Sequence, residues 1–205
     1  MTEAKNLYQN RRSVYALGKN LPISEQEVIE IIDNAVKYSP SAFNSNTAHA
    51  VVLLGDNHQK LWNITYAELA KLLPTDEAKA TTKGKIDNFA AAYGTILFFE
   101  DHNVVKGLQE QFPSYADNFP LWSEQSTGIA SFAVWNALAE AGVGANIQHY
   151  NPLIDEKVAK EWNKYVKYTR RYDSVLYFDL VEKIFKEDKE FERDMNFKLE
   201  LLKQT

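Results

Sequence analysis

The sequence predicts one mixed α/β domain, and three observations lead to this prediction. The chain has 205 residues, which is enough for one domain with a substantial core and short for two. Hydrophobic residues make up 45% and charged residues 25%, as in ordinary globular proteins. Segments with helical periodicity alternate along the chain with short apolar runs, which is typical of a domain that combines helices with a sheet.

The first predicted element is an amphipathic helix that begins after Ser24. The sequence Ser24-Glu25-Gln26-Glu27 has the form of a capping box, in which the serine accepts the amide of Glu27 and Glu27 reaches back. Pro40 ends the helix, because the residue before a proline disfavours helical angles. Between these limits, apolar residues recur on one face: Val28, Ile31, Ile32, Ala35 and Val36.

Further elements follow from apolar runs and turn residues. We expect buried strands at 50–54 and 93–100, and two further strands at 145–150 and 174–178. Helices are predicted at about 59–73, 121–141 and 152–162. The polar segment 75–85 is expected to be a mobile connection or a frayed helix, and 103–120 has mixed character. From Val181 onward we expect a charged amphipathic helix with one apolar stripe, formed by Ile184, Phe191, Met195 and Leu202.

The helix at 121–141 stands out because small residues occur along its whole length. Ile129, Phe132 and Trp135 are interleaved among them. Small side chains allow other backbones to approach closely, so we expect a central helix that is enclosed on several sides. The small residues are Ser126, Gly128, Ala130, Ser131, Ala133, Ala137 and Ala139.

Bulk properties argue against several classes of protein. The net charge of −5 gives no basic field for nucleic acid or for an anionic membrane. No window approaches the ~18 apolar residues that a membrane span requires, and the first twelve residues lack the apolar core of a secretory signal. The chain has no cysteine, which excludes disulfides and thiolate chemistry and fits a cytoplasmic protein.

The usual motifs of side-chain chemistry are absent. The four histidines show no metal-ligand spacing, so we expect no metal site. No phosphate-binding GxxxxGK[ST] loop and no GxSxG nucleophile motif occurs, and the Gly142-x-Gly144 pair lacks the third glycine of a dinucleotide fingerprint. Chemistry performed by a bound cofactor remains open.

Three short runs suggest such a cofactor. Arg11-Arg12-Ser13 offers two guanidinium groups and a hydroxyl, which suit a phosphate. Ser39-Pro40-Ser41-Ala42-Phe43-Asn44 forms a polar turn that could present donors to a flat heterocycle, and Gln148-His149-Tyr150 lies at a strand end. Each run also has an ordinary interpretation: a solvated arginine pair, a helix-to-strand turn, or a strand end without a ligand.

The order of these runs resembles the FMN-dependent nitroreductase family, in particular its small-chain branch with bacterial copper-induced and yeast members. The resemblance covers about the first 163 residues. It is carried by RRSVYALGKN at 11–20, SPSAFNSNTAHAVVLLGDNHQKLW at 39–62, LWSEQSTGIASFAVWNALAEAGVGANIQHYNPLID at 121–155, and KEWN at 160–163.

The resemblance implies an α+β, three-layer α/β/α sandwich with a mixed, mainly antiparallel sheet, and an intertwined homodimer. FMN would bind in two equivalent sites between the subunits. Arg11, Arg12 and Ser13 would hold its phosphate and ribityl end. Beside the flavin ring would lie a set of residues from two segments: Ser39, Pro40, Ser41, Asn44, Gln148 and His149.

The implied activity is ping-pong transfer of hydride from NADH or NADPH to the flavin, and then to a small planar aromatic acceptor such as a nitroaromatic or a quinone. No dedicated acid–base residue is needed, because the reaction takes place at the flavin. The alternative is a flavin-binding or flavin-free regulatory or stress-response protein on the same scaffold, without significant turnover.

The sequence departs from the branch after Asn163. The segment 164–172 lacks the Pro and the FGxP-like turn of the branch. An ungapped count places Arg171 where the family has an arginine near the phosphate, so Arg171 is a further candidate. The region 164–205 is a divergent extension, and its amphipathic stripe raises the idea that it docks a protein partner.

Overall fold

The computed structural model describes residues 7–162 in full and the backbone of residues 172–178 and 200–202. Arg171 and most of the expected tail helix lie outside this part of the chain. The elements, in chain order, are α2 (Glu25–Lys37), η1 (Ala42–Asn44), β1 (Ala48–Leu54), α3 (Gly55–Ala70), α4 (Asp76–Ala90), β2 (Gly94–Glu100), α5 (His102–Gln111), η2 (Pro113–Asn118), α6 (Phe119–Glu140), β3 (Ala145–Gln148), α7 (Asp155–Trp162), β4 (Tyr172–Phe178) and β5 (Glu200–Leu202).

The strands form one five-stranded sheet in the order β3-β4-β2-β1-β5. Three neighbouring pairs are antiparallel, and only β1 with β5 is parallel. The expected mixed, mainly antiparallel sheet is therefore confirmed. The four predicted strands are all present, with small shifts at their ends.

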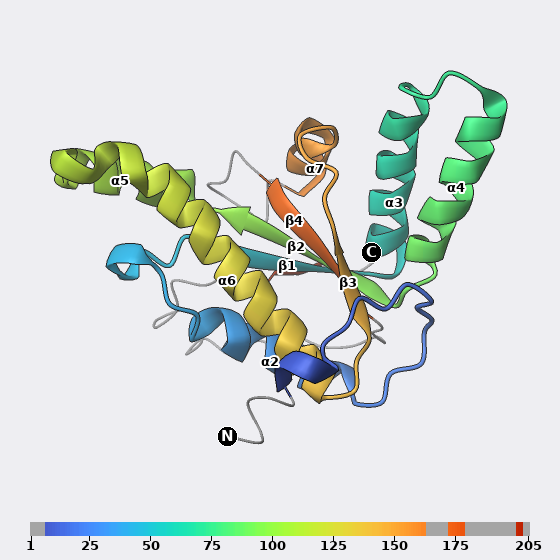
Figure 1. Cartoon of the computed structure of the whole chain (residues 1–205), viewed down its shortest axis with the longest axis horizontal. Helices are drawn as coiled ribbons and strands as arrows, with labels where there is room; N and C mark the ends of the chain where they lie inside the picture. The colour runs from blue at the N-terminus through green and yellow to red at the C-terminus, as the bar shows by residue number, and fades with distance from the viewer. Residues whose placement is uncertain (1–6, 163–171, 179–199, 203–205) are drawn as a thin grey trace.

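Helices cover both faces of this sheet (Figure 1). Alternate residues of β1 and β2 point to opposite faces, as the period of a strand requires. Ala50, Val52 and Phe98 pack with α2 and α6, whereas Val51 and Leu97 pack with α3, α4 and α7. Because both faces are buried, the strands read in the sequence as continuous apolar runs, and the three-layer expectation is confirmed.

Helix α2 agrees with its sequence prediction. The Ser24 side chain accepts from the Glu27 amide, and the Glu27 carboxylate accepts from the Ser24 amide, so the capping box is complete. The helix ends at Lys37, before Pro40, with Tyr38 as the C-cap residue. Val28, Ile32 and Val36 are buried on its inner face.

Two expectations about the middle of the chain were wrong. Helix α3 begins directly at Gly55 and not near residue 59, because the left-handed angle of Gly55 (φ 49°) turns the chain from strand to helix in one step. The polar segment 75–85 is neither a loop nor frayed. It forms most of α4, and the Thr75 side chain caps this helix by accepting a hydrogen bond from the Ala78 amide. The segment is polar because the buried residues of α4, Ile86 and Phe89, lie near the end of the helix.

Three further segments differ from the sequence predictions. The mixed segment 103–120 contains α5, which Asp101 caps by accepting the amides of Asn103 and Val104. Helix α7 begins at Asp155, three residues after Pro152, which follows a cis peptide bond. At the C-terminus, residues 200–202 form β5 beside β1, so the expected helix does not include Leu202.

His58 on α3 is buried and shows how the α3–α4 layer is tied to the sheet. Its Nε2 lies 3.2 Å from the Ala90 carbonyl oxygen, which can only accept, and its Nδ1 lies 2.8 Å from Thr95 Oγ1. The neutral ring therefore donates to Ala90 and accepts from the Thr95 hydroxyl. Burial lowers the pKa of His58 from 6.5 to about 4.

We expect this histidine to make the fold less stable as the pH falls from about 6.5 towards 4. The folded-state pKa lies below the unfolded-state value, so in this window the unfolded chain binds the proton more readily, and the full stability is present above it. The loss at pH 5 amounts to about 2 kcal/mol. Urea unfolding at pH 7 and pH 5 measures it. His58→Gln, which can still donate to Ala90, should reduce the difference; an unchanged difference would contradict the assignment.

Candidate functional site

Helix α6 runs past the expected cofactor residues and leaves one of its sides uncovered. Val134 and Leu138 are fully buried, whereas Leu121 is 54% exposed and Ile129 and Phe132 are each 44% exposed. Leu121, Gln125, Gly128, Ile129 and Phe132 lie on one side of the helix, because residues three and four apart are neighbours on a helix surface. Within the described part of the chain, the expected enclosure on several sides is therefore incomplete, and of the three exposed residues only Phe132 has a stacked ring beside it, that of Tyr8 at 6.2 Å.

The arginine segment, residues 11–13, lies against β3 and the second half of α6. Ser13 forms a parallel bridge with Ala145, and the next amide, of Val14, donates to the Ala145 carbonyl at 3.0 Å. The Arg11 guanidinium lies over the Trp135 ring, 4.1 Å from its centroid. Arg12 and Ser13 are exposed, so they can bind an anion without first giving up a buried contact.

The polar turn extends from residue 39 to residue 46, and we call it the 39–46 turn. The Ser39 hydroxyl donates to the Ala35 carbonyl at 2.6 Å, and Ser41 Oγ accepts from the Asn46 amide at 3.0 Å. These two serines therefore shape the turn itself. Asn44 is exposed, with its amide group available to a ligand.

The backbone of the 39–46 turn is strained. Phe43, Asn44 and Asn46 have φ values of 57°, 51° and 48°. Asparagine tolerates this left-handed region, but phenylalanine rarely enters it. Such a conformation persists only where surrounding contacts hold it.

Aromatic contacts hold Phe43 in this conformation. Its ring lies 5.0 Å from that of Phe112, 5.1 Å from Phe119, 5.7 Å from Tyr115 and 6.0 Å from Trp122, between ring centroids. Pairs of this kind contribute about 0.5–1.5 kcal/mol each beyond the burial of their area. We did not single out Phe43 from the sequence, although the spacing of aromatic residues at 112, 115, 119 and 122 was a visible signal.

Gln148 and His149 lie at the end of β3, about 10 Å from Ala145 and its bridge to Ser13 at the strand rise of ~3.3 Å per residue. Asn146, which sequence reasoning also missed, connects Gln148 to the arginine segment. It is fully buried; its Nδ2 donates to the Val14 carbonyl at 2.7 Å, and its Oδ1 accepts from Gln148 Nε2 at 3.1 Å. Because Gln148 presents its NH₂ group to Asn146, its carbonyl oxygen remains for a ligand.

Tyr150 belongs to the core and not to this surface. Its ring meets that of Trp62 edge to face at 6.1 Å, in the α3–α4 layer. Burial raises the pKa of Tyr150 to about 12, so the phenol stays protonated at neutral pH. Of the Gln148-His149-Tyr150 run, only the first two residues remain candidates.

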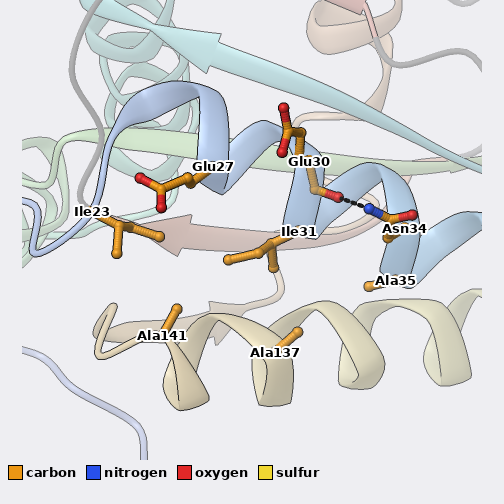
Figure 2. A pocket seen from close by; sticks show the side chains of 8 residues that line it. All are labelled: Ile23, Glu27, Glu30, Ile31, Asn34, Ala35, Ala137 and Ala141. Atoms are coloured by element: carbon orange, nitrogen blue, oxygen red, sulfur yellow. Dashed lines mark hydrogen bonds between the residues drawn. The ribbon is translucent and has the colours of Figure 1, made fainter.

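A groove between α2 and α6 has a volume of about 560 Å³ (Figure 2). Glu27, Glu30 and Asn34 stand on its α2 side, while Ile31 and Ala35 face Ala137 and Ala141 of α6. Among the described residues, none of the expected cofactor residues lines it. Its two carboxylates also do not suit a phosphate, so we do not identify this groove with the cofactor site.

One chain brings Gln148 and the arginine segment to β3 but keeps the 39–46 turn away from them. The turn contacts α6 where the Phe43 ring stacks on Trp122, and the arginine segment contacts it where the Arg11 guanidinium lies over Trp135. These two positions are thirteen residues apart, which is about 20 Å along a helix. Figure 1 shows the light-blue η1 and the dark-blue N-terminal segment well apart beside α6.

Within residues 7–162, no three or more histidines, aspartates or glutamates come together in a way that could hold a metal ion. In the same described part of the chain, no helix is both long and apolar enough to cross a membrane.

Comparison with known proteins then identifies the family. The model of the nitroreductase family matches residues 8–169, which is more than three quarters of the chain. The chain belongs to the nitroreductase family. The chain is 34% identical over 158 residues to nitroreductase FRM2 of Saccharomyces cerevisiae, covering 76% of this chain and 78% of the yeast protein.

Solved structures agree with this assignment. Nitroreductase CinD of Lactococcus lactis, in complex with chloramphenicol, is 51% identical and has a TM-score of 0.75, with 91% of this chain and 96% of CinD covered. A nitroreductase of Desulfitobacterium hafniense with bound FMN shares the fold, at 16% identity and a TM-score of 0.64, over 93% of this chain and 96% of that one. The fold is thus nitroreductase-like, as expected. The family match includes every expected cofactor residue except Arg171.

Proposed function

We propose that this nitroreductase is an FMN-dependent NAD(P)H oxidoreductase that works as a homodimer. The observation that carries the proposal is that the 39–46 turn and the arginine segment lie at opposite ends of an exposed apolar side of α6. An apolar surface of this kind on a central helix calls for a partner. A second copy of the chain would cover it and complete a site that one copy leaves in two halves.

The midpoint of α6 is suited to a two-fold axis. Gly128 and Ile129 lie halfway between Trp122 and Trp135, and apart from the adjacent residues and the backbone of α6 itself, no described atom lies within 4 Å of a Cβ built on Gly128. If two copies of α6 cross here in opposite directions, Trp122 of one copy comes near Trp135 of the other. The 39–46 turn of one subunit would then face the arginine segment of its partner.

The donor set of these segments fits FMN. Arg12 and Ser13 are exposed beside β3 and would hold the phosphate, with Arg11 positioned by Trp135. Arg171 stays a proposed further phosphate ligand and lies outside the described residues. From the other segments, Asn44, the free carbonyl oxygen of Gln148 and the exposed His149 would meet the polar edges of the flavin ring. Ser39, Pro40 and Ser41 would give the turn its shape.

Bound FMN would supply the redox chemistry, taking hydride from NADH or NADPH and passing electrons to an acceptor. The chain would bind and orient the cofactor and leave its ring accessible to flat molecules. CinD, the relative at about 50% identity, binds chloramphenicol and 4-nitrophenol. We therefore propose small planar aromatic acceptors, with nitroaromatics and quinones as the classes to try first. The absence of cysteine keeps the cytoplasm as the proposed location.

The colour of the purified protein tests the proposal directly. A yellow protein that NADH or NADPH bleaches and 4-nitrophenol or a quinone reoxidises supports the enzyme. A colourless protein that takes up no added FMN would contradict it, and would favour the alternative of a regulatory protein on the same scaffold.

Replacing Arg12 tests the phosphate assignment. Arg12→Ala should weaken FMN binding by about 1.5–3 kcal/mol, or roughly 10- to 100-fold in Kd, since a charge-assisted hydrogen bond to phosphate is lost. Titration of the apoprotein with FMN, followed by flavin fluorescence, measures the change. Lys19→Ala is a matched control, because it removes another exposed cation from the same part of the chain. Equal affinities in the two variants would exclude Arg12 as a phosphate ligand.

A further inference from the structure

A buried chain of hydrogen bonds lies at the base of the 39–46 turn. Thr47, Ser123 and Glu100 are 1%, 3% and 2% exposed. Ser123 Oγ lies 2.9 Å from Thr47 Oγ1 and 2.8 Å from Glu100 Oε2. These hydrogen bonds join three elements, because Thr47 directly precedes β1, Glu100 ends β2 and Ser123 lies near the start of α6.

The carboxylate sets the direction of these hydrogen bonds. An ionised Glu100 only accepts, and the Ser123 hydroxyl has a single proton, so Ser123 donates to Glu100 in its charged form. The Ser123 oxygen is then left to accept, and Thr47 must donate to it. Glu100 therefore determines which way the Thr47 hydroxyl points, although the two residues are connected only through Ser123.

The main chain of Thr47 is also bound at the end of β2. The Asp101 amide donates to the Thr47 carbonyl at 2.8 Å, and Asp101 also caps α5. Thr47 thus has both its backbone and its side chain attached to the end of β2. Because Asn46, the residue before it, is left-handed (φ 48°), the strained turn ends directly at this attachment.

We propose that Glu100 is a positioning residue for the cofactor site. Through Ser123 it holds Thr47, and so it keeps the 39–46 turn in the conformation that receives the flavin ring. Two attachments then hold the turn: the Phe43 aromatic cluster at its middle and the Glu100–Ser123–Thr47 chain at its end. The identity of the ligand in this inference rests on the proposed function, whereas the effect of Glu100 on the conformation of the turn does not.

Four variants of the full-length protein test the proposal. Thr47→Val removes the hydroxyl and keeps the shape, and Thr47→Ser restores the hydroxyl. Glu100→Gln keeps an acceptor but adds a donor, so the donor and acceptor roles of Ser123 and Thr47 are no longer determined. The control is Thr65→Val on α3, which also removes a fully buried hydroxyl, one that donates to the Leu61 carbonyl.

Two measurements are made on each variant. The first is the Kd for FMN by fluorescence titration: we expect roughly 10-fold weaker binding for Thr47→Val and several-fold weaker binding for Glu100→Gln. For Thr47→Ser and Thr65→Val, the Kd should stay within about 2-fold of that of the unmodified protein, since each variant leaves the Thr47–Ser123–Glu100 hydrogen bonds intact. The second is hydrogen–deuterium exchange of residues 39–47 without FMN, which should be faster in Thr47→Val and Glu100→Gln only.

The outcomes separate this proposal from the proposed function. If the unmodified chain takes up no FMN, the cofactor assignment fails, but the exchange measurement still decides the role of Glu100. If Thr47→Val exchanges and binds FMN like Thr47→Ser, the positioning role is overturned. It is also overturned if Thr65→Val changes FMN binding as much as Thr47→Val, because the effect would then reflect stability alone.

Discussion

Ile129→Glu is expected to convert the protein from a dimer to a monomer and to release FMN. Ile129 is 44% exposed in the single chain, so the substitution does little to the fold of one subunit. In the proposed dimer it lies beside the two-fold axis, where two carboxylates would face each other in an apolar interface. Burying unpaired charges costs several kcal/mol, so the dimer should weaken by at least about 100-fold.

Size-exclusion chromatography with light scattering measures the subunit number, and the ratio of flavin absorbance to protein absorbance measures the FMN retained. Leu72→Glu is the matched control. Leu72 is 68% exposed and follows α3, at the end of the molecule where α3 and α4 meet (Figure 1), away from α6. A dimer that retains FMN in Ile129→Glu would refute the interface. A monomer that retains FMN would refute the division of the site between subunits.

Asn146→Leu is expected to destabilise the chain and to weaken FMN binding together. The substitution leaves the Val14 carbonyl without its donor and Gln148 without its acceptor. A partly buried carbonyl that loses its partner costs about 1–3 kcal/mol. Because Asn146 connects the arginine segment to the end of β3, both would lose their fixed positions, and we expect the FMN affinity to fall roughly 10-fold or more.

Asn136→Leu on α6 is a stringent control for this prediction. Asn136 is also buried, at 4% exposure, but among the described residues its Nδ2 donates only to the Phe132 carbonyl one turn earlier in its own helix. Its Oδ1 has no partner within the described residues. Replacing the Asn136 amide should therefore leave the free energy of unfolding unchanged or slightly raised. Chemical denaturation compares the two variants, and equal losses would show that Asn146 has no special role.

Some parts of the fold could be predicted because they depend on neighbours in the sequence. The capping box at Ser24 and Glu27 and the stop near Pro40 involve residues three or four apart, so the limits of α2 were readable. The polar segment 75–85 misled us, since its helix buries only a narrow face and is otherwise stabilised by Thr75 and by exposed ion pairs such as Lys83 with Asp87. Composition alone does not distinguish such a helix from a loop.

The candidate site was predictable only in outline. The three polar runs could be found by residue type, and their order resembled one family. Their contacts could not be found in this way. That Arg11 lies over Trp135, that Asn146 connects Val14 to Gln148, and that Phe43 contacts rings of η2 and α6 depend on segments far apart in the chain.

The sequence by itself therefore determined the four main strands, helix α2, the family and the polar runs that suit FMN, because these depend on residue type and on short spacings. Only the tertiary structure decided how the runs are held and how far apart they lie. It places Trp122 and Trp135, and with them the two halves of the proposed site, about 20 Å apart along one rigid helix. The physical reason is that a helix keeps residues thirteen positions apart at a fixed distance, so one chain holds the two proposed halves apart, and we propose a second copy to complete the site.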